Sequence, residues 1–232
     1  MITQTKPARN SSIELLRIIA MLSIIAYHEH LHGLVNNFNL PNILERIDNN
    51  MFNLNVLFSY FVGWGGTFGN TIFILITGYF MINRNVNPSK IILLLANMLF
   101  YSWLIFIMVY IFMPQIYAMF TLKENLKVIA PILFGGNWFV SCYIIFFCFV
   151  PYLNKFLISL NKIQYLVFLL ICFCFFVLLP TLKISTYFNS ASMVFFASIY
   201  IIGGYLRLHF KENINKRYHK KLLCILLCLS FQ

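Results

Sequence analysis

Long apolar runs alternate with short polar segments along the whole chain. The runs are too long for the amphipathic helices or alternating strands of a water-soluble domain. A helix needs about 20 apolar residues to cross the hydrocarbon of a bilayer, and inside lipid it must satisfy its own backbone. The pattern therefore predicts membrane-spanning helices, which we place at residues 13–34, 56–82, 91–113, 138–158, 164–182 and 191–209.

A seventh apolar run begins at Lys221 and reaches Gln232. Its stretch "LLCILLCLSFQ" is too short to cross a membrane. This run predicts either a fragment or a last helix that is half inserted. We therefore expect residues 1–232 to form one all-α domain, a polytopic membrane helical bundle that is incomplete at its C-terminus, with about six complete spans and a partial seventh.

The composition supports the same class. Hydrophobic residues make up 61% of the chain and charged residues only 10%, whereas soluble domains contain about 25% charged residues. The net charge of +11 does not indicate a nucleic-acid partner, because the basic residues lie between apolar runs and form no stripe with interleaved aromatic residues. The six cysteines lie inside apolar runs, which is typical of packing residues rather than disulfides or a zinc site.

The distribution of basic residues predicts the topology. With the N-terminus in the cytoplasm, twelve of the 17 Lys and Arg residues fall in inner segments and four in outer segments. This bias predicts a multi-pass protein of the cell membrane with a cytoplasmic N-terminus. No small-residue cleavage site follows the first run, so we expect it to remain as a span. The outer segment 114–137 has an apolar middle, which predicts a short interfacial helix.

Two ionisable residues of the first span have a helical spacing. Arg17 precedes His28 by eleven residues, which places both on one helix face, roughly 16 Å apart along the axis and about 20° apart around it. Ionisable residues at membrane depth usually mark a functional site. The alternatives are an Arg17 that extends to the inner headgroups and a His28 that is a buried or interfacial histidine.

The sequence "HEHLH" also resembles a metal-binding pattern. His28 and His32 are four residues apart, which suits zinc on a helix. A catalytic zinc needs a third ligand, and His209 and His219 fall in cytoplasmic segments on the opposite side. We therefore expect no metal site.

The second span is rich in glycine, which indicates close packing of membrane helices. Its Asn70 and Thr77 are either part of that packing or line a polar cavity. Arg84 and Lys90 follow in an inner loop. Trp138 and Tyr143 open the fourth span, where they form either an interfacial belt or a cavity wall, and Asn137 is placed to cap that helix.

These segments together resemble the acyltransferase 3 family of membrane acyltransferases. "NSSIELLRIIAMLSIIAYH" is similar to the family's first helix, with ten residues between its arginine and histidine. The resemblance continues in order through nearly the whole chain, in "GNTIFILITGYFM", "NWFVSCYIIFFCFVPYLNKFL" and "YIIGGYLR". Two features depart from the family: "NRNVNPSK" replaces its Arg-x-Arg-like cluster, and this chain has fewer spans.

The resemblance implies an O-acyltransferase, chiefly an O-acetyltransferase. It would transfer an acyl group from cytoplasmic acyl-CoA, expected to be acetyl-CoA, to a hydroxyl of a surface polysaccharide or lipid-linked sugar. No resident cofactor is expected, and membrane lipid is the other partner. His28 would be the catalytic base and Arg17, Arg84 and Lys90 would bind the donor phosphates. Candidates for cavity or oxyanion-binding groups are Asn70, Thr77, Trp138 and Tyr143.

Two other hypotheses stay open at this stage. A polysaccharide flippase or exporter shares the many spans, the aromatic content and the basic inner loops. The chain also fits an inactive fragment of the acyltransferase, because its seventh run is short. The spacing of Arg17 and His28 and the ordered motifs favour acyl transfer.

Overall fold

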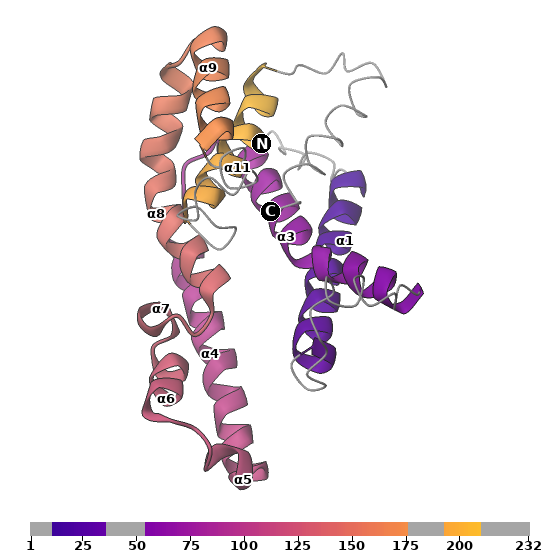
Figure 1. The fold of residues 1–232 in the computed structure, drawn as a ribbon. Helices are drawn as coiled ribbons and strands as arrows, with labels where there is room; N and C mark the ends of the chain where they lie inside the picture. The colour runs from indigo at the N-terminus through magenta and orange to yellow at the C-terminus, as the bar shows by residue number, and fades with distance from the viewer. Residues whose placement is uncertain (1–10, 36–53, 176–192, 210–232) are drawn as a thin grey trace, which may run out of the picture.

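The chain is mostly helical over the residues that the structure, a computed structural model, describes: 11–35, 54–175 and 193–209. No strand occurs in these ranges, which confirms the predicted all-α fold. The helices are α1 (Ser11–His28) with its π-helical continuation η1 (Glu29–Val35), α3 (Leu54–Met81), α4 (Pro88–Phe112), α5 (Pro114–Tyr117), α6 (Leu122–Ile129), α7 (Pro131–Phe134), α8 (Trp138–Ser159), α9 (Lys162–Phe173) and α11 (Met193–His209). Figure 1 shows their arrangement.

The long helices lie where the apolar runs predict them. Three are long and apolar enough to cross a membrane within the described residues: Ser11–His32, Pro88–Phe112 and Trp138–Ser159. Helix α3 has 28 residues but is richer in glycine and polar residues. Helices α9 and α11 are described over 12 and 17 residues, so the number of six complete spans stays a prediction. The seventh run lies outside the described residues.

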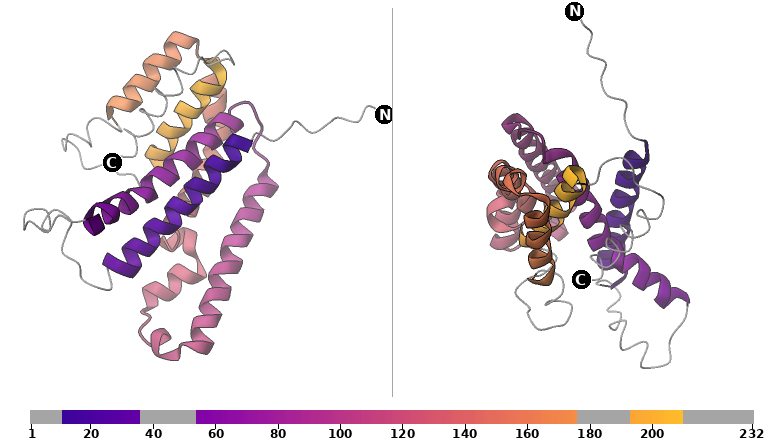
Figure 2. Two further views of the ribbon diagram at one scale, coloured as in Figure 1. Left: turned by 90° about the vertical axis from the view of Figure 1, so that its right-hand side faces the viewer. Right: turned by 90° about the horizontal axis from the view of Figure 1, so that it is seen from above.

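Helix α1 packs along α3 through glycines. The two helices lie side by side in both views of Figure 2. A Cβ atom added at Gly65 would lie 2.6 Å from the Ser23 carbonyl oxygen, and one at Gly69 would lie 2.6 Å from the Ala20 carbonyl oxygen. Only a residue without a side chain allows such an approach of backbones. Gly65 and Gly69 of the second span are therefore packing residues, as its richness in glycine indicates.

Helix α11 packs on the other side of α3. Gly78 lies against the backbone of Tyr200, and Gly203 lies against the carbonyl of Leu75. Beside this contact, aromatic and aliphatic side chains of α3, α8, α9 and α11 form the larger core, which includes Ile74, Phe146, Val150, Tyr165, Phe196, Ile199 and Tyr200. This core fixes α3, α8, α9 and α11 relative to one another.

Buried polar side chains connect these helices. Asn154 of α8 donates its amide to the Met81 carbonyl at 2.8 Å, and its side-chain oxygen accepts from the Tyr200 hydroxyl at 2.8 Å. The Tyr165 hydroxyl of α9 donates to the Ile201 carbonyl at 2.9 Å. Hydrogen bonds of this kind hold helices together where lipid offers no partner. Here they hold the C-terminal end of α3, directly before the loop that carries Arg84.

Helix α4 extends away from this core; α5 lies at its far end, and α6 and α7 lie alongside α4 (Figure 1). Apart from Met98, most of its apolar side chains are exposed or half-buried, as expected for a helix in lipid. Ser102 and Trp103 donate to the carbonyls of Val128 and Ile129 at the end of α6, at 3.2 and 3.3 Å. Residues 114–137 thus contain the short helices α5, α6 and α7, where the sequence predicts one, and its interfacial position stays a prediction.

Helix α6 begins with a capping box. The Thr121 backbone N–H and hydroxyl donate to the Glu124 carboxylate at 2.6 and 2.8 Å. The Glu124 backbone N–H donates in turn to the Thr121 hydroxyl. The backbone bond first, and then the hydroxyl bond, lower the pKa of Glu124. The capping box therefore persists at neutral pH with a charged carboxylate.

Candidate functional site

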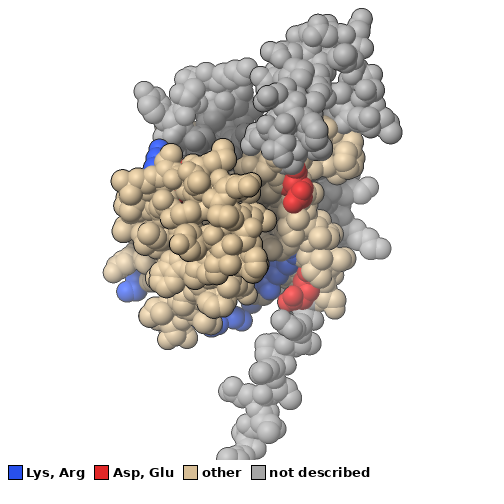
Figure 3. Space-filling view, turned by 90° about the horizontal axis from the view of Figure 1, so that it is seen from below, with Lys and Arg blue, Asp and Glu red and all other residues tan. Residues whose placement is uncertain are grey.

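A cavity of about 1050 Å³ opens where α1, α3, α4, α8 and α11 meet. Its lining combines basic side chains with apolar walls. The basic residues are Arg17, Arg84, Lys90 and Arg207, and Glu14 is the carboxylate among the described lining residues. The cavity therefore favours an anionic ligand. On the face that Figure 3 shows, basic and acidic side chains are scattered over a mostly uncharged surface.

The four cations come from segments that are distant in sequence. Arg17 lies two turns into α1, Arg84 follows the end of α3, Lys90 lies in the first turn of α4, and Arg207 lies in the last turn of α11. Because successive helices run in opposite directions, these four positions fall at the same end of the bundle. The structure thus brings together the three cations that the sequence analysis singled out and adds a fourth.

Arg17 is held by contacts with α1 and α3. Its Nη1 atom lies 3.4 Å from the Glu14 carboxylate, and its guanidinium carbon lies 5.8 Å from the centre of the Phe80 ring. The side chain is 41% exposed, so the guanidinium remains accessible from the cavity. A planar guanidinium in this position can donate two parallel hydrogen bonds to a phosphate.

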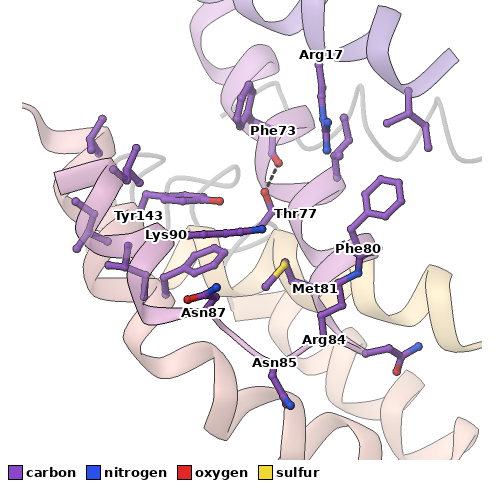
Figure 4. A pocket seen from close by; sticks show the side chains of 18 of the residues that line it. Arg17, Phe73, Thr77, Phe80, Met81, Arg84, Asn85, Asn87, Lys90 and Tyr143 are labelled. Atoms are coloured by element: carbon purple, nitrogen blue, oxygen red, sulfur yellow. Dashed lines mark hydrogen bonds between the residues drawn. The ribbon is translucent and has the colours of Figure 1, made fainter. Parts of the chain in front are cut away.

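Hydrogen bonds hold both ends of the loop between α3 and α4. The Met81 carbonyl is held by Asn154. Asn87 caps α4 by accepting a hydrogen bond from the Ser89 backbone N–H at 3.0 Å, and Pro88 occupies the first turn, where a missing N–H costs nothing. Lys90 therefore lies in the first turn of a capped helix. Figure 4 shows its side chain directed toward Thr77.

Thr77 and Tyr143 form the polar part of the cavity wall. Thr77 donates its hydroxyl to the Phe73 carbonyl at 2.8 Å. The Tyr143 side chain points toward Thr77 from α8 (Figure 4). Asn137 accepts a hydrogen bond from the Val140 backbone N–H and so caps α8, as predicted. The remaining wall is aliphatic and aromatic: Phe73, Ile76, Phe80, Ile91, Leu94, Phe139, Ile144 and Phe147.

His28 lies outside the lining of this cavity. Helix α1 is α-helical without interruption from Ser11 to His28, so Arg17 and His28 share a face as their spacing predicts. The His28 side chain is exposed, and its ring stacks on His32 with centroids 5.8 Å apart. The buried histidine of this segment is His30, which is 7% exposed and lies beside Gly63.

Asn70 and Trp138 also lie outside the cavity lining. Asn70 is half-buried on α3, two turns from Thr77 on the same face, which is about 10 Å along the helix. Trp138 is 38% exposed at the start of α8 and packs edge-on against Phe139. Neither residue therefore contacts the space between the four cations.

Two residues of the site region are absent from the sequence-based prediction. Arg207 ends the quoted motif "YIIGGYLR" and Asn154 lies within "NWFVSCYIIFFCFVPYLNKFL", but neither is assigned a role in the site. Arg207 contacts Tyr79, and Asn154 contacts Met81 and Tyr200. The spacing within each helix gives no indication of such contacts between helices.

No group of three or more His, Cys, Asp or Glu residues within the described ranges is arranged to hold a metal ion. The cavity offers a different chemistry. Its cations suit phosphate groups, and its apolar wall suits an uncharged arm of the same ligand.

The comparisons with known proteins agree with these features. A family model described as an acyltransferase domain, that of acyltransferase 3, matches residues 10–232. No curated protein and no solved structure matches the chain. The match begins just before α1 and includes every helix that lines the cavity. The chain therefore belongs to the acyltransferase 3 family of membrane acyltransferases.

Proposed function

We propose that the protein is an O-acyltransferase that moves an acetyl group from cytoplasmic acetyl-CoA to a hydroxyl of a surface polysaccharide or its lipid-linked precursor. The observation that carries this proposal is the cavity in which Arg17, Arg84 and Lys90 stand beside an apolar wall. The family supplies the reaction class. The donor, the acceptor and the role of each residue are inferences from the chemistry of the site.

The donor is a polyanion with a long uncharged arm. CoA carries a diphosphate and a 3′-phosphate at one end and its thioester at the other. Arg17, Arg84 and Lys90 would bind the phosphates, because hydrogen bonds between charged partners are the stronger ones. The pantetheine arm would then lie against the apolar wall and run along α1 toward His28, which is roughly 16 Å from Arg17 along the helix axis.

His28 would act as the general base. Its neutral imidazole would accept the proton of the acceptor hydroxyl while the hydroxyl oxygen attacks the thioester carbonyl. The new C–O bond forms, the C–S bond breaks, and the CoA sulfur leaves with a proton returned by the imidazole. The exposed position of His28 leaves room for an acceptor. Asn70 would be the candidate to stabilise the developing oxyanion, because it lies two turns from Thr77 in the direction of His28, whereas Thr77 lies beside Lys90 at the phosphate end of the cavity.

The acetyl content of the surface polysaccharide in cells tests this role of His28. His28→Ala should remove nearly all acetylation, because loss of a general base slows transfer about 100-fold or more. His32→Ala is the matched control, since it removes a second exposed histidine from the same segment. Wild-type acetyl content in His28→Ala cells at equal membrane abundance would refute the catalytic role.

A further inference from the structure

The fourth cation of the cavity, Arg207, has no role in the mechanism above. It lies in the last turn of α11 and lines the same space as Arg17, Arg84 and Lys90. Its Nη1 atom donates to the Tyr79 hydroxyl at 3.3 Å, and its guanidinium carbon lies 5.1 Å from the centre of the Tyr79 ring. Tyr79 therefore both accepts from Arg207 and offers it an aromatic face.

The position of Arg207 is fixed by a close approach of α3 and α11 at Gly203. A Cβ atom at Gly203 would lie 2.9 Å from the Tyr79 backbone nitrogen and 3.1 Å from the Cα atom of Gly78. Arg207 follows Gly203 by four residues, and so lies about one helical turn further on the same face. The close contact of Gly203 with α3 thus places Arg207 beside Tyr79, near the end of α3 that precedes Arg84.

Arg207 remains available to a ligand. It is exposed, and in the described part of the chain it forms no ion pair with a carboxylate. The Tyr79 bond is long, and an aromatic face does not neutralise the charge of a guanidinium. A guanidinium of this kind, held in place by an uncharged partner, suits bidentate contact with a phosphate.

We propose that Arg207 binds a phosphate of the acyl-CoA donor and that Tyr79 is the positioning residue that aims its guanidinium into the cavity. This inference rests on the proposed function. With Arg207, helix α11 contributes to the donor site together with α1, α4 and the loop that follows α3. The donor would therefore bridge the two helix pairs that meet at the glycines of α3.

Equilibrium binding of acetyl-CoA to the full chain in nanodiscs tests the inference. Arg207→Ala should weaken binding about tenfold or more, the loss expected for a hydrogen-bonded charge contact. Arg207→Lys should recover part of the affinity, and Arg207→Gln, which can still donate to Tyr79, controls for folding. Lys155→Ala is the matched control, because it removes an exposed positive charge of α8 that does not line the cavity.

Acetyl-dephospho-CoA identifies the phosphate. If the Arg207→Ala loss disappears with this probe, Arg207 contacts the 3′-phosphate; if the loss persists, Arg207 contacts the diphosphate, and both results support the inference. Tyr79→Leu should weaken acetyl-CoA binding in the wild-type background and have little further effect in Arg207→Ala. This loss of additivity is expected of a residue that acts through Arg207 and not of a merely structural one.

Two results would overturn the inference. If Arg17→Ala weakens acetyl-CoA binding and Arg207→Ala does not, the proposed function stands and Arg207 is left to lipid headgroups. If neither substitution changes the binding, or the wild-type chain does not bind acetyl-CoA, the proposed function fails together with this inference.

Discussion

Arg17 shows most clearly what a single residue contributes to the site. A cation in a membrane helix often extends to the headgroups, but Arg17 lies over Phe80 and lines the cavity. Its contact with Glu14 is 3.4 Å long and only three residues away in sequence, so it is a weak local ion pair. The guanidinium is therefore oriented without being neutralised, as a phosphate-binding group needs to be.

Arg17→Lys should lower donor affinity more than it lowers stability. The lysine keeps the charge and loses the planar fork, at a cost of about 1 kcal/mol or roughly a fivefold rise in the apparent KM for acetyl-CoA. The measurement is the KM in membranes, with melting of the purified chain as the stability readout. An unchanged KM for Arg17→Ala, the stronger variant, would contradict the assignment.

At the scale of elements, α3 organises the molecule. It presents glycines to α1 on one side and to α11 on the other, so both neighbours approach its backbone. Its C-terminal end is held by Asn154 and leads into the Arg84 loop. The geometry of the cavity therefore depends on the distance between α1 and α3, which is set by the glycines at their contact.

Gly65→Ala should separate α1 from α3 and weaken acetyl-CoA binding. The added Cβ would lie 2.6 Å from the Ser23 carbonyl oxygen, and a backbone atom cannot move aside as a flexible side chain can. Overpacking of this kind costs about 1–3 kcal/mol. The measurements are melting temperature and acetyl-CoA affinity of the purified chain.

Gly63→Ala supplies the control on the same helix. Its Cβ would lie 3.9 Å from the His30 ring, an ordinary contact. This variant should keep the stability and the donor affinity of the wild type. If both variants behave alike, close packing at Gly65 does not set the cavity.

At the scale of the whole molecule, the orientation in the membrane decides whether the cavity can meet CoA. The four cations lie at one end of the bundle. The excess of Lys and Arg in alternate segments predicts that this end is cytoplasmic. CoA does not cross a membrane unaided, so the proposed mechanism requires this orientation.

Single cysteines at Asn49 and Asn213, in a background without the six native cysteines, test the orientation. A membrane-impermeant thiol reagent applied to intact cells should label position 49 and spare position 213. The reverse pattern would place Arg17, Arg84 and Lys90 outside and would leave an outward-facing transporter or a structural membrane protein as the better account.

The sequence predicts the helices well because apolar length alone defines a span. It places the start of α4 at residue 91, whereas Asn87 caps the helix and Pro88 begins it. It also predicts that the ends of successive spans bring Arg17, Arg84 and Lys90 to one side. The sequence does not predict that these three side chains line one cavity, because this depends on how the helices cross.

The position of each residue along and around its helix explains which of the other predicted residues line the cavity. Thr77 and Tyr143 line the cavity, but Asn70 lies two turns away from Thr77 on the same face, and Trp138 precedes Tyr143 by five residues, about 140° around α8. The roles of Asn70, Trp138 and His28 stay predictions. Arg207 could not be found from spacing, because its contact with Tyr79 depends on the crossing of α3 and α11.

Transfer of radiolabelled acetyl from acetyl-CoA tests the central claim most directly. Inside-out membrane vesicles expose the cytoplasmic face to the donor, and the label is then counted in the glycan fraction. Wild-type vesicles should accumulate labelled glycan, whereas vesicles with His28→Ala should fall to the level of vesicles that lack the protein, and vesicles with Arg17→Ala should label more slowly when acetyl-CoA is limiting. Equal labelling in wild-type and His28→Ala vesicles, or none in wild-type vesicles supplied with acceptor, would contradict the account.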